Sequence, residues 1–323
     1  MSAGGAAARR AILALPLAAP IRPARAQGFP DRPLRLVVPY SPGGGTDVVG
    51  RELARHMAAA LGQSVIVENR SGANTAVGAE YVARSRPDGY TLYFAGASSL
   101  VVPPLVWRRL PYRPEDFTPI SLVLKQPYGL GVTPGLAGGL GELLDKLRAE
   151  PDKLGFGHTG TGGIGHLLGE RLMATTGTRM FSVSYRGFQQ TVLDVMSGRL
   201  AMTFEAVNNF LPFLADGSVR LIAVSSSARL ARPEVPTFAE AGYPDMGVAS
   251  WLAVWAPAGT PPPVIARLNQ AVVAAVASAE FRAMAEAQVQ SAESGSPEAL
   301  AEFAARDIAA WRRVIEPLDL KVD

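Results

Sequence analysis

Short apolar runs alternate along the chain with segments whose apolar residues recur every three or four positions. The first kind of run is typical of a buried strand, and the second is typical of an amphipathic helix. This alternation predicts an α/β fold with mostly parallel sheets. The predicted strands are 34–39, 64–68, 91–95, 154–158, 181–185, 201–204, 221–225 and 251–256. The predicted helices are 46–61, 75–85, 140–149, 163–176, 191–197, 261–277 and 297–314, and Thr46 or Asp47 is expected to cap the first of them.

The first 26 residues differ from the rest of the chain. Arg9 and Arg10 precede an apolar run of about ten residues, and Ala24-Arg25-Ala26 follows it. Such a segment is typical of an export signal, and it is too short to cross a bilayer, which needs about 20 apolar residues. We therefore expect a periplasmic protein that is cleaved near Ala26, exported by the general or the twin-arginine route. A cytosolic tail is the alternative.

Composition narrows the possible classes of protein. The 323 residues suggest about two domains. The net charge of +3 comes from residues 1–26, which hold four arginines and no acid; the remaining 27 basic residues face 28 acidic ones. The body of the chain therefore gives no basic footprint for nucleic acid. The absence of cysteine excludes disulfides, a cysteine nucleophile and a thiolate metal site.

The first candidate binding motif covers residues 39–47, Pro-Tyr-Ser-Pro-Gly-Gly-Gly-Thr-Asp, between a predicted strand and a predicted helix. Glycines let the backbone approach a ligand closely. The free N–H groups and the positive end of a helix dipole favour a carboxylate or a phosphate at such a place. A glycine-rich turn without a ligand would show the same pattern, so both interpretations stay open here.

The second candidate motif, residues 157–166, repeats this arrangement after another predicted strand. Gly160, Gly162 and Gly165 spell G-x-G-x-x-G, but the acidic residue that a dinucleotide site needs about 20 positions later is absent. His158 and His166 lack a third ligand at a natural spacing, so we predict neither a metal nor a cofactor. No nucleophile elbow, P-loop or H-E-x-x-H motif occurs, which argues against an enzyme.

A third candidate, Tyr185-Arg186-Gly187, follows a predicted strand. The guanidinium of Arg186 could bind a carboxylate with two parallel hydrogen bonds. An ion pair of Arg186 with Glu205 or Asp194 is an equally good interpretation.

These blocks occur in the order seen in one family. Residues 39–44, with Asp47 and Arg51 behind them, resemble the P-F-x-P-G-G-x-x-D-x-x-A-R opening of the periplasmic receptors of tripartite tricarboxylate transporters, the Bug family. Further resembling blocks are 67–73, 87–92, 160–167, 183–187, 235–242 and 256–261. Together they extend over residues 29 to 317, nearly the whole chain after the predicted signal.

The resemblance implies a two-domain periplasmic-binding-protein fold, similar to type II, with two mostly parallel sheets flanked by helices and a ligand cleft between the domains. It implies that 27–125 plus 250–323 form domain 1 and that 126–249 form domain 2. The chain would cross between them near 122–128 and 246–251. The C-terminal helices would return to domain 1.

The resemblance also implies that the two glycine-rich loops hold a carboxylate, partly through ordered water. The candidate ligand-binding residues are Tyr40, Ser41, Gly43, Gly44, Thr46, Asp47, Ser98, Thr159, Gly160, Thr161, Gly162, Gly163, His166, Tyr185, Arg186 and Glu205. Tyr40 replaces the usual Phe and Ser71 the usual Pro, while 189–191 and 205–208 depart from the family pattern. These departures leave the identity of the ligand open.

The sequence thus predicts a solute-binding receptor that is not an enzyme. It would be a monomer that captures a small organic acid and delivers it to the membrane permease of a tripartite tricarboxylate transporter, or to a sensor kinase. The alternative from another class is an NAD(P)-dependent oxidoreductase that uses Gly160–Gly165. A ligand-sensing regulator with the same fold would need a DNA-binding helix-turn-helix, which does not precede the first predicted strand.

Overall fold

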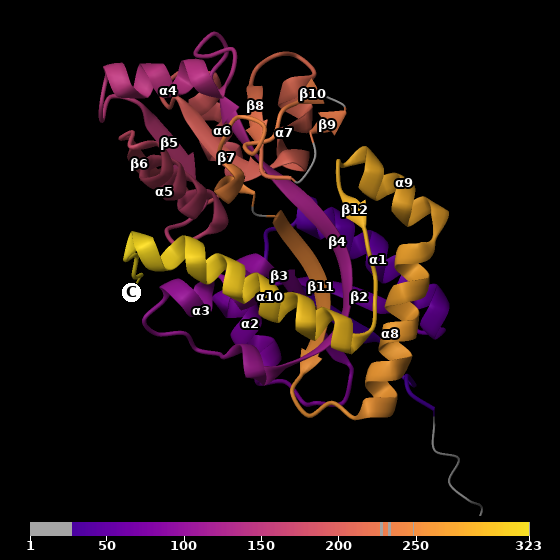
Figure 1. Cartoon of the computed structure of the whole chain (residues 1–323). Helices are drawn as coiled ribbons and strands as arrows, with labels where there is room; N and C mark the ends of the chain where they lie inside the picture. Colours follow the sequence, from indigo (N-terminus) through magenta and orange to yellow (C-terminus); the bar gives the residue numbers. More distant parts are fainter. Residues whose placement is uncertain (1–27, 227–228, 232–233, 248, 323) are drawn as a thin grey trace, which may run out of the picture.

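The computed structural model describes residues 28–322 except 227–228, 232–233 and 248. The predicted export signal, residues 1–26, lies outside the described residues. Two lobes are visible in Figure 1, joined by strands that run from one lobe into the other. Within the described ranges, no single helix is both long and apolar enough to cross a membrane. The helices at 262–277 and 279–287 meet that criterion only as a pair, which is bent by 63°.

The first lobe is built on a five-stranded sheet in the order β2-β1-β3-β11-β4, with β12 added beside β4. The strands are β1 (Leu34–Val38), β2 (Val65–Asn69), β3 (Thr91–Gly96), β4 (Phe117–Val132), β11 (Ala249–Pro257) and β12 (Ser291–Ala292). β1 is parallel to both of its neighbours, whereas β11 is antiparallel to β3 and β4. Parallel pairing follows from the predicted alternation of strands and helices, because two neighbouring parallel strands need a crossover connection and the intervening helix supplies it.

The second lobe continues the same sheet through β4 in the order β4-β7-β5-β6, with β8 also pairing β4. Its strands are β5 (Gly155–His158), β6 (Phe181–Ser184), β7 (Met202–Ala206) and β8 (Arg220–Val224), and β9 (Leu230–Ala231) and β10 (Glu234–Val235) form a separate pair. β5 is parallel to β6 and β7, whereas β4 is antiparallel to β7 and β8. Instead of two mostly parallel sheets, the lobes therefore share one mixed sheet, because the strands that cross between them pair antiparallel with their neighbours.

Helices cover both faces of this sheet (Figure 1). The α-helices are α1 (Gly45–Leu61), α2 (Ala76–Ala83), α3 (Pro103–Val106), α4 (Leu140–Ala149), α5 (Ile164–Thr176), α6 (Phe188–Met196), α7 (Val207–Leu214), α8 (Pro262–Ala277), α9 (Ala279–Ala287) and α10 (Pro297–Ile315). Shorter turns are the π-helical η1 (Ala97–Val101) and the 3₁₀ segments η2 (Pro114–Asp116), η3 (Pro244–Met246) and η4 (Glu316–Leu318). All seven predicted helices are present among them, whereas α3, α7, α9 and the four η segments were not predicted.

The two ends of α1 differ in how well the sequence predicted them. Val49, Leu53, Met57 and Leu61, which recur at helical spacing, are buried, and Gly62 ends the helix in the left-handed conformation. The expected cap was wrong. The helix begins one residue earlier, after Gly44, and no side chain accepts a capping hydrogen bond there. Asp47 instead turns its carboxylate back toward the loop.

β4 links the lobes. Its residues up to Pro127 pair with β11, and those from Tyr128 onward pair with β7 and β8. One cluster of buried apolar side chains extends through both lobes and includes Tyr93, Phe156 and Trp311. Trp311 belongs to α10, which contacts both β4 and α5. The lobes are therefore joined by backbone pairing and by a shared apolar core near the C-terminal end of α10.

Candidate functional site

The β1–α1 loop is fixed by Asp47, which is 2% exposed. The N–H of Gly43 and Nε of Arg51 each donate to Asp47 Oδ2 at 2.9 Å, and Nδ2 of Asn69 donates to Oδ1 at 2.8 Å. Burial acts to raise the pKa of Asp47, but the hydrogen bonds from Arg51, Gly43 and Asn69 outweigh it and hold the pKa below its ordinary value. Asp47 is therefore an ionised anchor of the loop.

The first turn of α1 keeps its backbone donors available. The N–H of Gly44 points back to Ser41 O, and the intrahelical bonds begin with Val48 N donating to Gly44 O at 3.0 Å. The N–H groups of residues 45–47 therefore have no acceptor within the helix. With the positive end of the helix dipole, they favour an anion at this point.

The β5–α5 loop is positioned by His166 in a comparable way. Gly160 and Gly162 have φ of 129° and 76°, which side chains other than glycine rarely adopt. The N–H of Gly162 donates to His166 Nδ1 at 3.2 Å, within a turn closed by Gly163 N and Gly160 O. Because Gly163 caps α5, the N–H groups of residues 164–166 are left without an intrahelical acceptor.

A second histidine lies behind this loop. His158 is 2% exposed, and its ring centroid is 4.4 Å from that of His166. Burial, followed by the neighbouring His166, lowers the pKa of His158 to about 4, so the ring is neutral near pH 7.

The side chains near the two histidines determine whether a metal ion could bind there. The Glu170 carboxylate lies 3.5 Å from Nε2 of His166. Within the described part of the chain, no group of three His, Cys, Asp or Glu side chains could hold a metal ion.

Glu205 ends β7 and is 8% exposed. The N–H of Ala206 donates to Glu205 Oε1 at 2.8 Å, and the side chains of Asn209 and Thr159 also hydrogen-bond to the carboxylate. Burial raises the pKa of Glu205 to about 7, and the hydrogen bonds only partly oppose this rise. Since Thr159 belongs to the β5–α5 loop, Glu205 links the end of β7 to the second candidate motif.

Two tyrosines from other elements accompany Glu205. The hydroxyl of Tyr40, which follows β1, lies 2.5 Å from Ser98 Oγ. Burial raises the pKa of Tyr40 to about 12, and the charge of Glu205 adds to the rise. Burial and Glu205 likewise raise the pKa of Tyr128 on β4. Both phenols therefore lie within electrostatic range of one buried carboxyl group.

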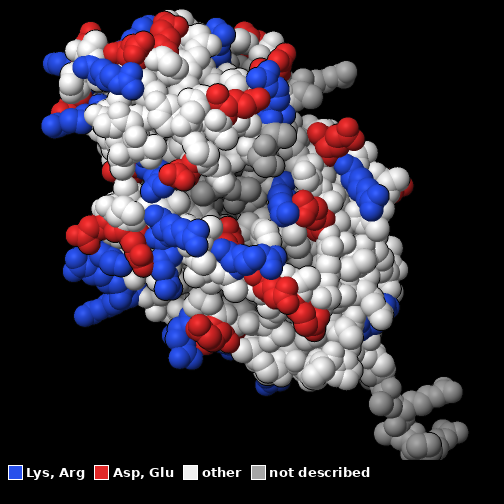
Figure 2. Space-filling model, in the orientation of Figure 1, with Lys and Arg blue, Asp and Glu red and all other residues white. Residues whose placement is uncertain are grey.

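We call the region where these elements meet the interlobe seam. It consists of residues 40–47 and 73–75 of the first lobe and residues 159–163 and 205–209 of the second. A Cβ on Gly45 would lie 2.3 Å from Asn208 Nδ2 and 3.1 Å from Asn209 Oδ1, and a Cβ on Gly163 would lie 3.9 Å from Asn74 Oδ1. Figure 2 shows the surface hollowed where the lobes meet, with charges of both signs interspersed on the face shown.

Sequence reasoning missed the asparagines of the seam. Ala73, Asn74 and Thr75 form three consecutive non-glycine residues with φ of 44°, 45° and 78°, a strained stretch beside the second loop. Asn74 Nδ2 and Asn208 Oδ1 are buried without a hydrogen-bond partner among the residues that the structure describes. Asparagine tolerates the left-handed conformation, which suits the position of Asn74, but no local pattern marked Asn74 or Asn208 as part of a site.

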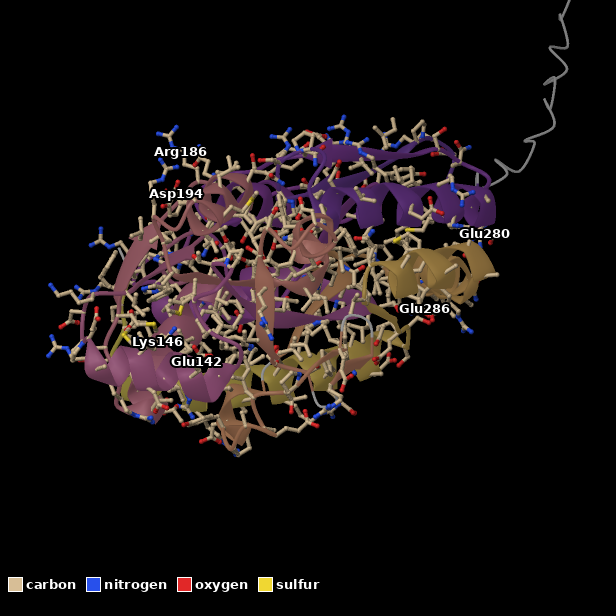
Figure 3. The ribbon with its side chains drawn as sticks, turned by 90° about the horizontal axis from the view of Figure 1, so that it is seen from above. Glu142, Lys146, Arg186, Asp194, Glu280 and Glu286 are labelled. Atoms are coloured by element: carbon tan, nitrogen blue, oxygen red, sulfur yellow. The ribbon has the colours of Figure 1, made fainter. Side chains whose placement is uncertain are left out.

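The structure places two of the expected site residues outside the seam. Tyr185 donates its hydroxyl hydrogen to Asp194 Oδ2 at 2.6 Å, and Arg199 pairs with the same carboxylate. Arg186 is exposed, and Figure 3 shows it projecting from the periphery of the molecule. No ion pair of Arg186 with Glu205 or Asp194 is found within the described residues.

The other expected residues lie in the seam or directly behind it. The exposed ones are Ser41, Gly43, Gly44, Thr159 and Thr161, and the partly exposed ones are Tyr40, Thr46, Ser98, Gly160 and Gly163. Asp47, Gly162, His166 and Glu205 are buried. Each glycine-rich loop thus lies beside a residue of the opposite lobe, Asn208 or Asn74, whereas the 185–186 motif does not line the seam.

Comparison with known proteins decides the classification. Residues 49–320 match the family model described as "Tripartite tricarboxylate transporter family receptor". The chain belongs to this receptor family. The resemblance seen in the sequence motifs is confirmed, and the match gives no support to an oxidoreductase. The family is a family of binding receptors rather than a class of enzymes.

Members of the receptor family also resemble this chain in sequence and structure. Protein BugT of Bordetella pertussis is 34% identical over 304 residues, which are 93% of each chain. The structure of Rpa4515 of R. palustris with adipate has a TM-score of 0.85 at 32% identity, covering 91% of this chain and 99% of that one. MatC from Rhodopseudomonas palustris with bound malate has a TM-score of 0.82 at 29% identity, covering 89% and 100%. These likenesses confirm the two-domain binding-protein fold.

Proposed function

We propose that this chain is a periplasmic receptor that captures a small organic acid and presents it to a tripartite tricarboxylate transporter. The observation that carries the proposal is that two glycine-rich loops, each at a helix N-terminus, face the opposite lobe, one beside Asn208 and the other beside Asn74. Relatives whose structures hold adipate and malate support a carboxylate as the ligand. The membrane permease of such a transporter is the proposed partner, and a sensor kinase is the alternative partner.

The proposed ligand site uses backbone donors rather than basic side chains. The N–H groups of residues 45–47 and 164–166 have no intrahelical acceptor, and each set lies at the positive end of a helix dipole. Bridging waters let such donors share one anion. Tyr40, Ser98 and Glu205 would contact the rest of the ligand. Asp47 and His166 would hold the two loops in place.

We also propose the finer features of the receptor. The binding unit is a monomer in which 27–125 plus 250–323 form one domain and 126–249 the other. The domains close about β4 and the start of β11, so that the ligand is enclosed between them. The export signal is removed near Ala26. No resident cofactor or metal takes part.

The proposal is tested with the purified chain and a panel of organic acids. Thermal-shift measurements would screen mono-, di- and tricarboxylates and amino acids, and calorimetry would measure Kd for each acid that raises the Tm. A receptor stabilised by its ligand follows mass action, so the Tm must rise further as the ligand concentration rises. If no acid raises the Tm at millimolar concentration, the carboxylate-receptor proposal is wrong.

The contact between Gly45 and Asn208 gives a prediction about closure. Gly45→Ala adds a Cβ that would lie 2.3 Å from Asn208 Nδ2 in the closed seam, while alanine favours the first turn of α1 over glycine. We expect ligand affinity to fall about tenfold or more, the order of an overpacking cost of 1–3 kcal/mol.

A double-mutant cycle tests the cause of this loss. Asn208→Ala removes the amide, so Gly45→Ala should cost much less affinity in the Asn208→Ala background than in the wild type. Calorimetry on all four proteins measures the coupling. Equal losses in both backgrounds would show that the two residues do not meet in the ligand-bound state.

A further inference from the structure

Glu205 is a carboxyl group of the interlobe seam whose burial is not yet explained, and it is well placed to contact a ligand. It lies at the carboxyl end of β7, where α7 begins, and is 8% exposed. Its hydrogen-bond donors are neutral: the N–H of Ala206 and the side chains of Asn209 and Thr159. Among the described residues, no Lys or Arg forms an ion pair with it. The carboxyl group is thus buried without a compensating cation.

The surroundings of Glu205 do not supply the missing positive charge. The phenols of Tyr40 and Tyr128 lie near enough for the carboxylate to influence them, and burial keeps both neutral. Arg51, which lies in the second turn of α1 behind the first loop, is already bonded to Asp47 and Asn69. A buried charge without a partner is unfavourable, which agrees with the raised pKa of Glu205, about 7.

The hydrogen bonds indicate which ligand group would suit this site. The N–H of Ala206 donates to Glu205 Oε1 at 2.8 Å, and the side chains of Asn209 and Thr159 also act to lower its pKa, so these neutral neighbours favour the ionised form. An ionised carboxylate in a buried site attracts an ammonium through a charge-assisted hydrogen bond. It repels a second carboxylate, because like charges in one site disfavour each other.

We propose that Glu205 is a specificity-determining residue that selects ligands carrying an ammonium group in addition to the carboxylate held by the two loops. This inference rests on the proposed function and narrows it: the substrates are amino acids or other amino-bearing organic acids rather than dicarboxylates. The helix N-termini hold the negative end of the ligand. Glu205 holds the positive end and gains the cation that the protein does not provide.

The test compares ligands that differ only in the group at the far end. For each chain length from three to six carbons, calorimetry measures Kd for the α-amino acid, the α,ω-amino acid, the dicarboxylate and the monocarboxylate. We expect the best amino acid to bind about 10- to 100-fold more tightly than the matched dicarboxylate and monocarboxylate. A wild-type preference for the dicarboxylate, or no preference, overturns the inference but leaves the carboxylate receptor standing.

A conservative variant tests whether Glu205 causes the preference for amino acids. Glu205→Gln keeps the shape of the side chain and removes the charge, so it should abolish the amino-acid preference. The matched control is Glu142→Gln, a glutamate of α4 that is exposed and pairs with Lys146 away from the seam (Figure 3). It should change nothing.

The outcomes separate the two proposals. An amino-acid preference that survives in Glu205→Gln overturns the role of Glu205. If none of the four ligand classes binds the wild type, the proposed function fails and the inference fails with it. If Glu205→Gln does not fold, the wild-type comparison alone still decides whether an ammonium group is preferred.

Discussion

Replacing Gly43 by proline is expected to abolish carboxylate binding. Gly43 has φ of 78°, which the proline ring cannot adopt, and its N–H donates to Asp47 Oδ2 at 2.9 Å. The substitution removes both the conformation and the bond, so the loop must rearrange and the donors of residues 45–47 lose their position. Calorimetry with the best ligand should show a loss of at least about 100-fold, the equivalent of roughly 3 kcal/mol.

Two control variants separate a local effect from general damage. Gly43→Ala keeps the N–H, meets no atom within 4 Å and bears only the left-handed penalty of about 1–2 kcal/mol, so its loss should be smaller. Gly62→Pro replaces a glycine of φ 70° at the opposite end of α1. The N–H of Gly62 also donates one hydrogen bond, to Ala58 O. It should lower the Tm without changing Kd. Equal loss of binding in Gly43→Pro and Gly62→Pro would contradict the role of the loop.

Replacing Gly96 by alanine is expected to cause the largest loss of stability. Gly96 ends β3 opposite Leu252 of β11, and a Cβ there would lie only 1.7 Å from Trp251 O and 2.7 Å from Trp251 C. Backbone atoms in the middle of a sheet cannot move aside, and Trp251 is itself buried and donates to Asp307 of α10 at 2.7 Å. We expect a loss of about 3 kcal/mol or more, and a fall in Tm on the order of 10 °C.

Gly141→Ala is the matched control for this prediction. Gly141 lies inside α4, where an added Cβ meets no atom within 4 Å. The same change of residue should therefore stabilise the protein by about 0.5–1 kcal/mol, because alanine has the higher helix propensity. Thermal and urea unfolding of both variants measures the contrast. A Gly96→Ala variant as stable as the wild type would mean that β3 and β11 do not approach each other so closely.

The local elements of the candidate site were predictable because neighbouring residues determine them. The glycine-rich runs at 43–45 and 160–163 follow strands and precede helices in the structure as the hydrophobic pattern suggested. The function of individual side chains was less accessible. Asp47 reads as a helix cap, yet it bonds Gly43, Arg51 and Asn69, and Asn69 comes from a strand 22 residues later. Such a bond depends on the parallel register of β1 and β2.

The long-range features of the site required the tertiary structure. Asn74 and Asn208 meet the two loops only because the lobes come together, and no local pattern marks either residue as part of a site. The 185–186 motif shows the opposite case. It matches the family pattern in sequence, yet Tyr185 bonds Asp194 and Arg186 projects outward. A motif fixes the backbone around it, whereas the direction of an exposed side chain depends on neighbours distant in sequence.

The sequence by itself determined the alternation of strands and helices, the two glycine-rich anion loops and the family, because periodicity, turn residues and motif order are local properties of a chain. Only the tertiary structure decided that the crossing strands pair antiparallel, that each loop lies beside a residue of the opposite lobe and that Glu205 is buried in the seam without a cation. Pairing and burial depend on contacts between residues far apart in sequence. The first set of facts places the chain in a receptor family, and the second is the basis of the proposal for the ligands that it selects.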